Sequence, residues 1–464
     1  MTIEIFYKIV DCLRKATKDS EFENCTYVVG GAVRNLIMNL EIKDIDLCIE
    51  MVDGGLKFAE YMQANGHTLG SVVTYPTYGT AMFRLKEFPD YEIECVQTRG
   101  EQYHDKESRN PQVTYADIFE DCHRRDLTMN ALYFRISDGV TLDLTSNGID
   151  DINNKICRVT NEDPDIVFQD DPLRILRVIR FASRYGFDVE DDTYRSMIKN
   201  VDRLSIITQE RITDEFNKML MGNDPVRAMV FLRFTGALKY VLPEFGEMIG
   251  MVQNEFHVGD VWEHTMKVIN NAAKKEPTLD VMLGAVFHDV GKIKTQTFGE
   301  DGRVHFYGHE RVGAELTKEI MQRMRYSNDL IKDVVFYVEN HMRTKQWGDD
   351  LSKMKQKSLR KLEYQAGKRI WKLLEVIDAD NKAHKPEHCM NNQVSNIIEE
   401  ILNAPRNMVE YELPVTGDDI MEFKNIKPGP AVKKYKEHLL KCAFNNPFIT
   451  KEECFKQIKN LKFD

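Results

Sequence analysis

Two aspartates one residue apart, Asp44 and Asp46, follow a glycine turn and are well suited to bind a metal. Alternate residues of a strand point to the same side, so a strand over 45–49 would present the two carboxylates together. Neighbouring carboxylates repel each other unless a cation lies between them. Such oxygen ligands suit Mg²⁺, which binds one or two carboxylates together with substrate phosphates. The pair therefore predicts a magnesium site for a phosphate-bearing substrate.

The turn just upstream, which contains Gly30 and Gly31, supplies the other half of such a site. Glycines let the backbone approach a ligand closely, and the helix expected over 32–40 offers free N–H groups to a phosphate at its start. Arg34 lies one turn into that helix, where its guanidinium can grip phosphate oxygens. Either half alone is common in unrelated proteins. Together they indicate a metal-dependent nucleotidyl-transfer site.

A third carboxylate is expected on a neighbouring strand. Glu94 lies in the alternating run over 92–97 and could help to hold the metal or to deprotonate an attacking hydroxyl. Glu92 shares its face and is a rival. A solvated strand glutamate is the alternative interpretation of either residue.

Two arginines, Arg124 and Arg125, come directly before a short apolar strand expected over 131–136. They could clamp a triphosphate or a ribose, and Asn130 could hydrogen-bond a sugar or a base. Taken alone, the same residues would be interpreted as a surface charge pair.

The segment from Asp170 onward has the features of a helix start, with two aspartates in the first turn and a proline at an early position. Asp171 and Arg174 are three residues apart and share a face, which Arg177 and Arg180 extend. Cytosine and adenine both present an amine donor beside a ring-nitrogen acceptor, so a carboxylate and a guanidinium can select them together. Uracil and guanine present the opposite order. The alternative is a capped helix with a solvated arginine stripe.

These motifs occur together in an order that resembles the class II tRNA nucleotidyltransferase and bacterial poly(A) polymerase family. The motifs are VVGGAVRN, DID, Glu94, RRDLTMNAL, DDPLRILRVIRF and ERITDE, and the resemblance covers residues 25 to about 220. It implies that Asp44 and Asp46 hold Mg²⁺ and that Glu94 joins them. The nucleotide-binding residues that we predict on this basis are Gly30, Gly31, Arg34, Arg125, Asp126, Asn130, Asp171, Arg174, Arg177 and Arg180.

Two positions depart from the family pattern. The family usually has Asp where Asn35 stands and Glu where Asp170 stands. Asn35 removes a charge that normally orients the arginine or the loop, so a reduced turnover is expected, whereas Asp170 keeps its charge. We interpret the ERITDE motif, Glu210 to Glu215, as a structural helix rather than a catalytic one.

A second group of chemical residues lies further along the chain and includes His264, His288, Asp289, His309 and Asp380. Imidazoles mixed with carboxylates bind transition metals and leave positions open for water. The segments VFHDVGK and GHERVGA resemble an HD phosphohydrolase domain over roughly 255–385, which implies that His264, His288, Asp289 and Asp380 are its metal ligands.

In this second group Asp378 is a rival for the last ligand position, and His341 could add a contact. The expected metal is Ni, Mn, Co, Fe or Mg. An active centre would hydrolyse phosphomonoesters or 2′,3′-cyclic phosphates through a metal-bound hydroxide. The alternative is a domain retained only as a packing scaffold.

The elements that must position these residues indicate an α+β protein. Residues 1 to about 150 combine an amphipathic N-terminal helix, short β-rich runs that include one over 80–85, and one clear helix, whereas the pattern beyond Asp165 is almost wholly helical. We therefore expect a small mixed-sheet head over 1–150, a helical neck over 151–250, an HD domain over 251–390 and a helical RNA-binding tail over 391–464.

The composition fits a soluble cytoplasmic protein. The 464 residues are 42% hydrophobic and 30% charged, with a net charge of −11. No apolar run approaches the roughly 18 residues of a membrane span, so no membrane partner is expected. Nine scattered cysteines without a C-x-x-C pair indicate reduced thiols.

The leading hypothesis is the addition of CCA to tRNA 3′ ends from CTP and ATP. Poly(A) synthesis and CC-only or A-only addition are close alternatives, and an HD phosphohydrolase with a non-catalytic RNA-gripping head is an alternative of another class. In the tail, four lysines could contact tRNA phosphates or form a solvated face; they are Lys427, Lys433, Lys434 and Lys436.

Overall fold

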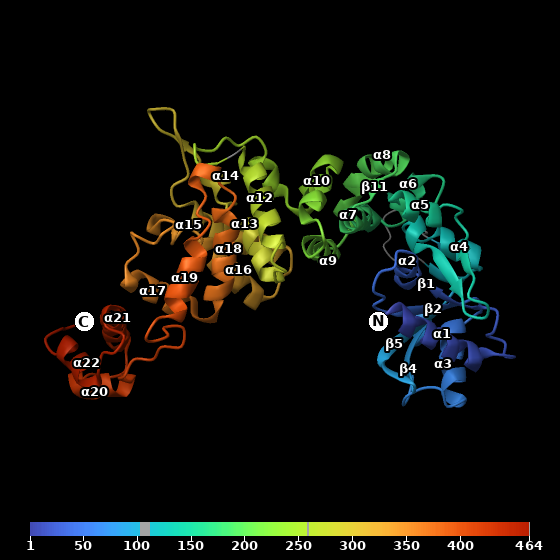
Figure 1. The fold of residues 1–464 in the computed structure, drawn as a ribbon, viewed down its shortest axis with the longest axis horizontal. Helices are drawn as coiled ribbons and strands as arrows, with labels where there is room; N and C mark the ends of the chain where they lie inside the picture. The colour runs from blue at the N-terminus through green and yellow to red at the C-terminus, as the bar shows by residue number, and fades with distance from the viewer. Residues whose placement is uncertain (103–111, 258, 464) are drawn as a thin grey trace. The chain divides into compact units, whose positions relative to one another are not determined.

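The computed structural model describes residues 1–102, 112–257 and 259–463. They form two compact units, Met1–Pro243 and Glu244–Asp464, which Figure 1 colours from blue to green and from green to red. The first unit contains a mixed sheet followed by helices and the second is almost entirely helical, which confirms the predicted α+β class. The division into four domains stays a prediction. Among the described helices, none has the length and apolar character needed to cross a bilayer.

A seven-stranded mixed sheet, in the order β3-β4-β5-β2-β1-β8-β9, forms the centre of the first unit. Its strands are β1 (Thr26–Val29), β2 (Ile45–Ile49), β3 (Val73–Tyr75), β4 (Thr80–Leu85), β5 (Phe88–Gln97), β8 (Leu132–Arg135) and β9 (Thr141–Asp143). β2 runs antiparallel to β1 and parallel to β5. Sequence analysis predicted β2 and β4 with these bounds and missed β3 and β9.

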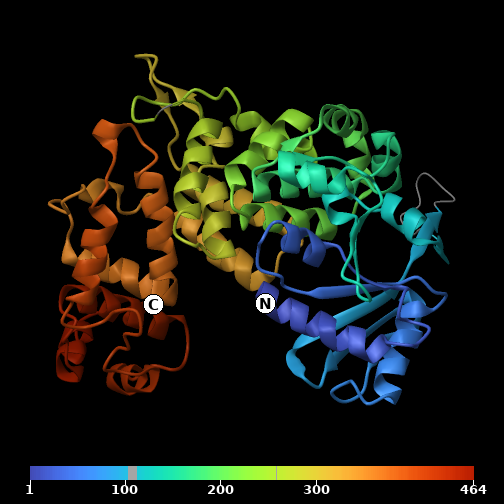
Figure 2. The ribbon, with the colours of Figure 1, turned by 45° about the vertical axis from the view of Figure 1, so that its right-hand side comes forward.

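Two helices cover one face of this sheet. The helices of the sheet region are α1 (Ile3–Thr17), α2 (Gly31–Ile37), α3 (Gly54–Ala64), α4 (Ile118–His123) and α5 (Gly148–Asn154). Phe6 of α1 packs edge-on against Phe134, and Phe58 of α3 packs against Phe83. Figure 2 shows α1, the dark blue helix next to the N label, in front of the strands. Because side chains alternate along β2, Leu47 points into this packed face and Asp46 points to the other.

The sequence prediction of a single clear helix in this region was therefore incomplete, because α3, α4 and α5 are also present. The predicted helix over 32–40 is shorter than expected. It begins at Gly31 and ends at Ile37.

The rest of the first unit is helical. Its elements are α6 (Pro164–Asp170), α7 (Leu173–Tyr185), α8 (Asp191–Asn200), α9 (Gln209–Leu220), α10 (Pro225–Thr235), α11 (Leu238–Val241) and the short strands β10 (Ile156–Cys157) and β11 (Asp188–Val189). The predicted helix start at Asp170 is wrong, because Asp170 ends α6, Asp171 is its C-cap and Pro172 is the N-cap of α7. Proline disfavours helical backbone in the residue before it, which separates the two helices.

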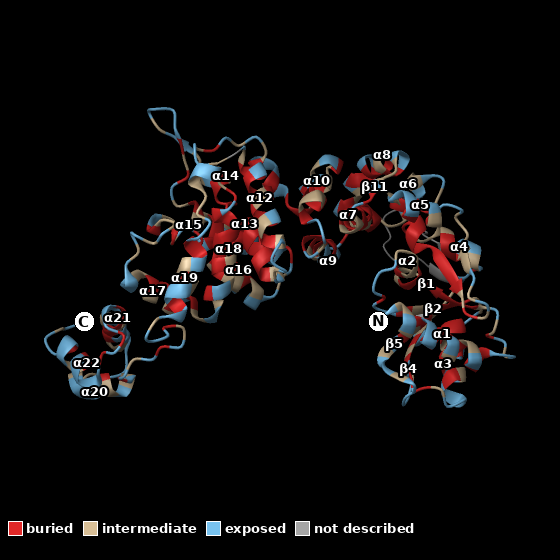
Figure 3. Ribbon diagram, viewed as in Figure 1, coloured by how far each residue is buried: buried red, intermediate tan, exposed pale blue. Residues whose placement is uncertain are grey.

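Two hydrophobic cores can be followed among the described residues of the second unit. Its main helices are α12 (Val261–Ala273), α13 (Leu279–Phe287), α15 (His309–Arg323), α16 (Asn328–Asn340), α17 (Gln356–Ala366), α18 (Ile370–Asn381), α19 (Gln393–Leu402), α20 (Gly417–Lys424), α21 (Pro430–Asn445) and α22 (Lys451–Ile458). One core joins α13, α16, α17, α18 and α19, and the other begins at Met408 and joins α20, α21 and α22. Figure 3 shows buried residues gathered where α13, α16 and α18 pack together.

Candidate active sites

The head carboxylates meet because of strand register. Asp46 of β2 pairs directly with Glu94 of β5, and laterally paired residues point to the same face. Asp44 lies just before β2 and is exposed. Burial, followed by the charges of Glu94 and Asp44, raises the pKa of Asp46 to about 6 from 3.8. The site therefore concentrates negative charge that a divalent cation would neutralise, and its hard oxygen donors fit Mg²⁺.

The rival carboxylate, Glu92, has a different partner. It pairs across the strands with Arg84, and the Arg84 Nη2 atom lies 3.6 Å from its Oε2 atom. Glu94 rather than Glu92 is thus the glutamate beside Asp46.

The glycine turn lies next to the same carboxylates. Gly30 has φ +66°, which favours glycine, and a β-carbon there would lie 4.0 Å from the Asp46 Oδ2 atom and 3.9 Å from the Arg125 Nη1 atom. Gly31 lies beside Arg34, whose Nη2 atom would be 3.4 Å from a β-carbon. The turn, a carboxylate and an arginine therefore surround one small space.

Asp121, which sequence analysis did not identify, anchors the arginine pair. Its buried carboxylate accepts from the Arg124 Nη2 atom at 2.6 Å and from the Arg125 Nη2 atom at 2.9 Å, and it also accepts from the Tyr133 hydroxyl. Burial alone would raise the pKa of Asp121, but Arg125 and Arg124 hold it at about 2. Asp121 precedes these arginines by three and four residues, a helical spacing that could have revealed the contact.

Arg34 is held by amides rather than by a carboxylate. Asn35 Oδ1 accepts from the Arg34 Nε and Nη2 atoms at 3.1 and 2.8 Å, and its Nδ2 atom donates to the Glu41 carbonyl at 2.7 Å. Asn130 Oδ1 accepts from the Arg34 Nη1 atom at 2.5 Å. The amide of Asn35 thus orients Arg34 without the charge that the family usually has here, and on this geometry we no longer expect Asn35 to lower turnover.

The same network reaches the arginine helix α7. Asn130 donates to Asp126 at 3.1 Å, and the Arg177 Nε and Nη2 atoms donate to the other Asp126 oxygen at 2.8 and 2.7 Å. Burial would raise the pKa of Asp126, but Arg177 holds it at about 2. A continuous chain of polar contacts therefore links the glycine turn to α7.

The predicted base-selecting pair is bound to protein groups. Asp171 Oδ2 accepts from the Arg211 Nη2 atom at 2.8 Å, whereas the Arg174 Nη2 atom donates to the Arg124 carbonyl at 2.7 Å. Arg180 donates to Glu215 at 2.6 Å. Both Arg211 and Glu215 belong to the ERITDE motif, and their contacts with this region agree with a structural interpretation of that motif.

In the second unit, the four predicted ligands come together. His288 Nε2 lies 3.2 Å from Asp289 Oδ2, and His264 Nε2 lies 3.5 Å from the same oxygen and 3.2 Å from Asp380 Oδ1. All four residues are buried. Burial lowers the pKa of His264 to about 4, which keeps it neutral and able to bind a metal. Imidazole nitrogens and carboxylate oxygens in this arrangement fit a divalent metal.

Asp378, the rival for the last position, is paired elsewhere. Its Oδ2 atom lies 2.5 Å from Lys275 Nζ and 2.8 Å from Lys382 Nζ. Asp380, which faces His264, is therefore the better candidate.

Additional histidines extend the group. His309 and His341 join Asp289, and His257 joins His264 and Asp289, as sets able to hold a metal among the described residues. Sequence analysis did not identify His257, which lies in the loop before α12.

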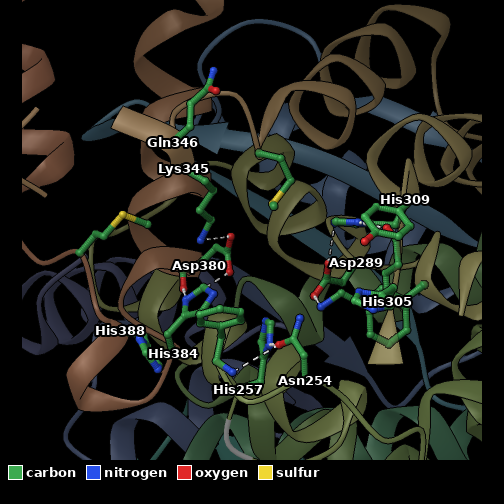
Figure 4. Close-up of a pocket in the computed structure, with 16 residues that line it drawn as sticks. Asn254, His257, Asp289, His305, His309, Lys345, Gln346, Asp380, His384 and His388 are labelled. Atoms are coloured by element: carbon green, nitrogen blue, oxygen red, sulfur yellow. Dashed lines mark hydrogen bonds and ion pairs between the residues drawn. The ribbon is translucent and has the colours of Figure 1, made fainter. Parts of the chain in front are cut away.

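A cavity of about 590 Å³ opens onto this cluster. Asp289, His309 and Asp380 line it together with Lys292 and Lys345. Lys292 Nζ lies 2.6 Å from Asp289 Oδ2, and Lys345 Nζ lies 2.8 Å from Asp380 Oδ2, as Figure 4 shows for Lys345. Positive side chains at a cavity wall suit a phosphate-bearing ligand.

Two further predictions concern residues outside these centres. The four tail lysines are exposed on and before α21, and their contact with RNA stays a prediction. The nine cysteines are free thiols, as predicted.

Comparison with known proteins agrees with both centres. Residues 26–158 match the family described as "Poly A polymerase head domain", residues 186–248 match "Probable RNA and SrmB- binding site of polymerase A", and residues 261–380 match "HD domain". A multifunctional CCA protein of Azoarcus sp. is 30% identical over 335 residues, covering 68% of this chain and 73% of that protein.

Two other similar proteins extend over more of the chain. An A-adding tRNA nucleotidyltransferase of Deinococcus radiodurans is 28% identical over 417 residues, covering 87% of this chain and 88% of that protein. The CCA-adding enzyme of Bacillus stearothermophilus, solved in complex with CTP, has a TM-score of 0.66 at 20% identity and covers 98% of this chain and 97% of that one.

The fold and the two centres thus define a nucleotidyltransferase head joined to an HD domain. The chain belongs to the tRNA nucleotidyltransferase and poly(A) polymerase family that includes the multifunctional CCA proteins.

Proposed function

We propose that this protein adds CCA to the 3′ end of tRNA without a template, using CTP and ATP. The observation that carries the proposal is the pairing of Asp46 with Glu94 beside Gly30 and Arg125. The multifunctional CCA proteins among its relatives support the choice of tRNA and of these nucleotides.

In this proposal, Asp44 and Asp46 hold Mg²⁺, which would activate the tRNA 3′-hydroxyl and stabilise the charge on the triphosphate. Arg125 and Arg34 orient the phosphates beside the glycine turn. Glu94 adds a negative charge beside Asp46 and accepts the proton of the attacking hydroxyl.

Base choice is assigned to Asp171 and Arg174, with Arg177 and Asp126 holding α7 against the head. Asp171 would accept from the exocyclic amine of C or A, and Arg174 would donate to the ring nitrogen. Both side chains must exchange a protein partner for the base, because Asp171 now pairs with Arg211 and Arg174 with the Arg124 carbonyl.

Sequencing of reaction products tests this assignment. The protein is incubated with tRNA that lacks CCA, tRNA that ends in C and tRNA that ends in CC, each with CTP, ATP or both. When CTP and ATP are both present, complete CCA is expected on all three substrates. Addition of A only to the CC end would instead establish A-adding activity, which the Deinococcus relative makes a specific alternative, and long A tracts without C would establish poly(A) synthesis.

We further propose that the HD domain hydrolyses phosphomonoesters or 2′,3′-cyclic phosphates at a divalent metal. The buried ligands His264, His288, Asp289 and Asp380 beside the cavity support this second activity. Ni, Mn, Co, Fe and Mg are the metals to compare. His288→Ala should abolish hydrolysis and leave nucleotide addition intact; an unchanged hydrolysis rate would contradict the proposal and leave the domain a scaffold.

A protein whose head only grips RNA is the remaining alternative. Asp46→Ala tests this alternative. If nucleotide incorporation survives the substitution, the carboxylates of the head do not catalyse the reaction.

A further inference from the structure

We propose that Phe181 and Tyr185 of α7 form an aromatic platform that positions Arg34 to bind the triphosphate of the incoming nucleotide. This inference rests on the nucleotide transfer proposed above and adds two positioning residues to it. Sequence analysis identified neither aromatic residue as a candidate. Because α7 also carries Arg174, which is assigned to base choice, the platform would connect the phosphate-binding arginine of the head with the helix that selects the base.

The two rings are nearly parallel, and Arg34 faces both of them. Phe181 and Tyr185 are four residues apart on α7, a spacing that places them on one face of the helix. Their ring centroids are 6.2 Å apart, with an angle of 8° between the planes. The Arg34 Cζ atom lies 5.2 Å from the Phe181 centroid and 5.1 Å from the Tyr185 centroid. A cation within about 6 Å of an aromatic centroid is attracted by the ring, so both rings contribute.

The platform supplies negative potential beside a poorly compensated cation. Arg34 is buried, and among the described residues its side-chain hydrogen bonds go to the amides of Asn35 and Asn130. Burial lowers the pKa of Arg34, and the positive charges of Arg184 and Arg180 act in the same direction. A neutral amide does not balance a charge, whereas the face of an aromatic ring carries negative potential. The rings therefore take over part of the role of the carboxylate that the family usually has in place of Asn35.

The ring of Tyr185, and not its hydroxyl, makes this contact. The hydroxyl oxygen is buried and has no hydrogen-bond partner among the described residues. A buried hydroxyl without a partner destabilises the folded state, so it does not explain how Arg34 is held. Phenylalanine at this position should consequently serve as well as tyrosine, which distinguishes a platform from a hydrogen-bonding role.

Arg34 connects the platform to the glycine turn. A β-carbon on Gly31 would lie 3.4 Å from the Arg34 Nη2 atom, so the guanidinium lies directly beside the turn. A guanidinium has five N–H groups, and Asn35 and Asn130 accept from its Nε, Nη1 and Nη2 atoms. The remaining N–H groups can bind phosphate oxygens, and the rings fix the plane in which they point. Donors ordered in advance bind a ligand without the entropic cost of immobilising a long side chain.

A second arginine with an aromatic contact in the same unit provides a comparison. The Arg227 Cζ atom lies 5.3 Å from the ring centroid of Phe231 on α10, and Arg227 also donates to Asp188 at 2.7 Å. Arg227 therefore has a carboxylate partner, whereas Arg34 depends on amides and rings. Phe231 is half-buried, as Tyr185 is, which makes it a matched control position.

Steady-state kinetics of the full-length protein test the inference. Incorporation of labelled CTP into tRNA lacking CCA, or of ATP into tRNA ending in CC, is measured at saturating tRNA and Mg²⁺. Tyr185→Leu should raise the KM for the nucleotide about tenfold and leave kcat nearly unchanged, because the contact is present in the bound state and in the transition state alike. Tyr185→Phe should restore a KM close to that of wild type. Phe231→Leu should leave the KM unchanged.

A double variant shows whether Tyr185 acts through Arg34. Arg34→Gln removes the cation and should itself raise the KM for the nucleotide. Tyr185→Leu should then add little, because residues that act as one unit have non-additive effects. Fully additive effects would show that Tyr185 acts independently of Arg34 and would overturn the inference.

Fluorinated phenylalanines at position 185 test the same contact while they preserve the packing. Successive fluorine atoms weaken the negative potential of the ring face and change the shape of the ring little. The KM for the nucleotide should rise with each added fluorine. A constant KM across this series would overturn the inference, even if the Tyr185→Leu protein failed to fold.

The outcomes separate this inference from the proposed function. A wild-type protein that incorporates neither CTP nor ATP would overturn nucleotide transfer itself. Normal incorporation by wild type, together with an unchanged KM in Tyr185→Leu or an equal rise in Tyr185→Phe, would overturn the platform alone. An equal rise of KM in Phe231→Leu would indicate a general loss of packing and would likewise overturn it.

Discussion

Asp46→Asn should stabilise the metal-free protein while it abolishes nucleotide transfer. Asp46 is partly buried, and its lateral neighbour in the sheet is Glu94. Burial and the charges of Glu94 and Asp44 raise its pKa to about 6. The amide has nearly the same shape and no charge, so it removes the electrostatic cost of the site. Functional sites often carry such local destabilisation.

The size of the gain follows from the pKa. One pKa unit corresponds to about 1.36 kcal/mol, so a rise from 3.8 to about 6 sets an upper bound of about 3 kcal/mol. Residual solvent contact reduces this value, and we expect about 1–3 kcal/mol, or several degrees in Tm. The pKa is higher in the folded state, so the cost to wild type develops as pH rises from about 4 to about 6 and is constant above that range.

Differential scanning calorimetry in a chelator at about pH 4.5 and about pH 7.5 measures this difference. Asp46→Asn should raise the Tm of the first unit mainly at the higher pH. Asp44→Asn serves for comparison, because it removes a charge that ranks after burial and Glu94 among the causes of the raised pKa of Asp46, and it should raise Tm less than Asp46→Asn. An equal gain at both pH values, or no gain at the higher pH, would refute the electrostatic account of the site.

Three further substitutions test individual contacts. Asn35→Asp should cost about 1 kcal/mol of unfolding free energy without raising kcat, because it replaces a donor to the Glu41 carbonyl at 2.7 Å; a higher kcat would contradict the role given to the amide. Tyr133→Phe should cost about 1–3 kcal/mol in thermal unfolding, because buried Asp121 loses a donor; a change below about 0.5 kcal/mol would contradict this. Gly291→Ala should weaken Mn²⁺ binding at the HD centre at least about tenfold in calorimetric titration while nucleotide addition is retained, because a β-carbon there would lie 2.0 Å from the His309 carbonyl; an unchanged Kd would show that this close packing does not position Asp289.

The sequence was informative wherever local periodicity decides the structure. Alternation placed Asp46 and Glu94 on strands with the right faces, and the observed register confirms that they are neighbours. The strands over 45–49 and 80–85 were likewise predicted with their observed bounds.

Contacts made by long side chains across the fold were not predictable in this way. Asp171 pairs with Arg211, forty residues away, and Arg174 donates to a carbonyl fifty residues away. Helical and strand periodicity gives no information about contacts between residues so far apart in the sequence. The sequence alone therefore could not show that Asp171 and Arg174 each have a partner within the protein. The two helices that meet at Asp171 were interpreted as one start because aspartate and proline also favour helix N-termini.

In the second unit, the HD dipeptide and its spacing located the centre, but sequence left Asp378 and Asp380 as rivals. The structure distinguishes the two aspartates, because Asp380 of α18 faces His264 whereas Asp378 pairs with two lysines. His257 lies in a loop, where helical and strand periods give no information about direction.

The central claim, that the carboxylates on β2 and β5 perform nucleotide transfer, is tested most directly by comparing two glutamates on one strand. Incorporation of labelled CTP into tRNA lacking CCA is measured for Glu94→Gln and for Glu92→Gln at saturating Mg²⁺. Glu94 lies beside Asp46, whereas Glu92 pairs with Arg84. The account predicts a loss of at least about tenfold in rate for Glu94→Gln, about 1.4 kcal/mol of activation free energy, and a nearly unchanged rate for Glu92→Gln. Equal rates for the two variants would contradict it.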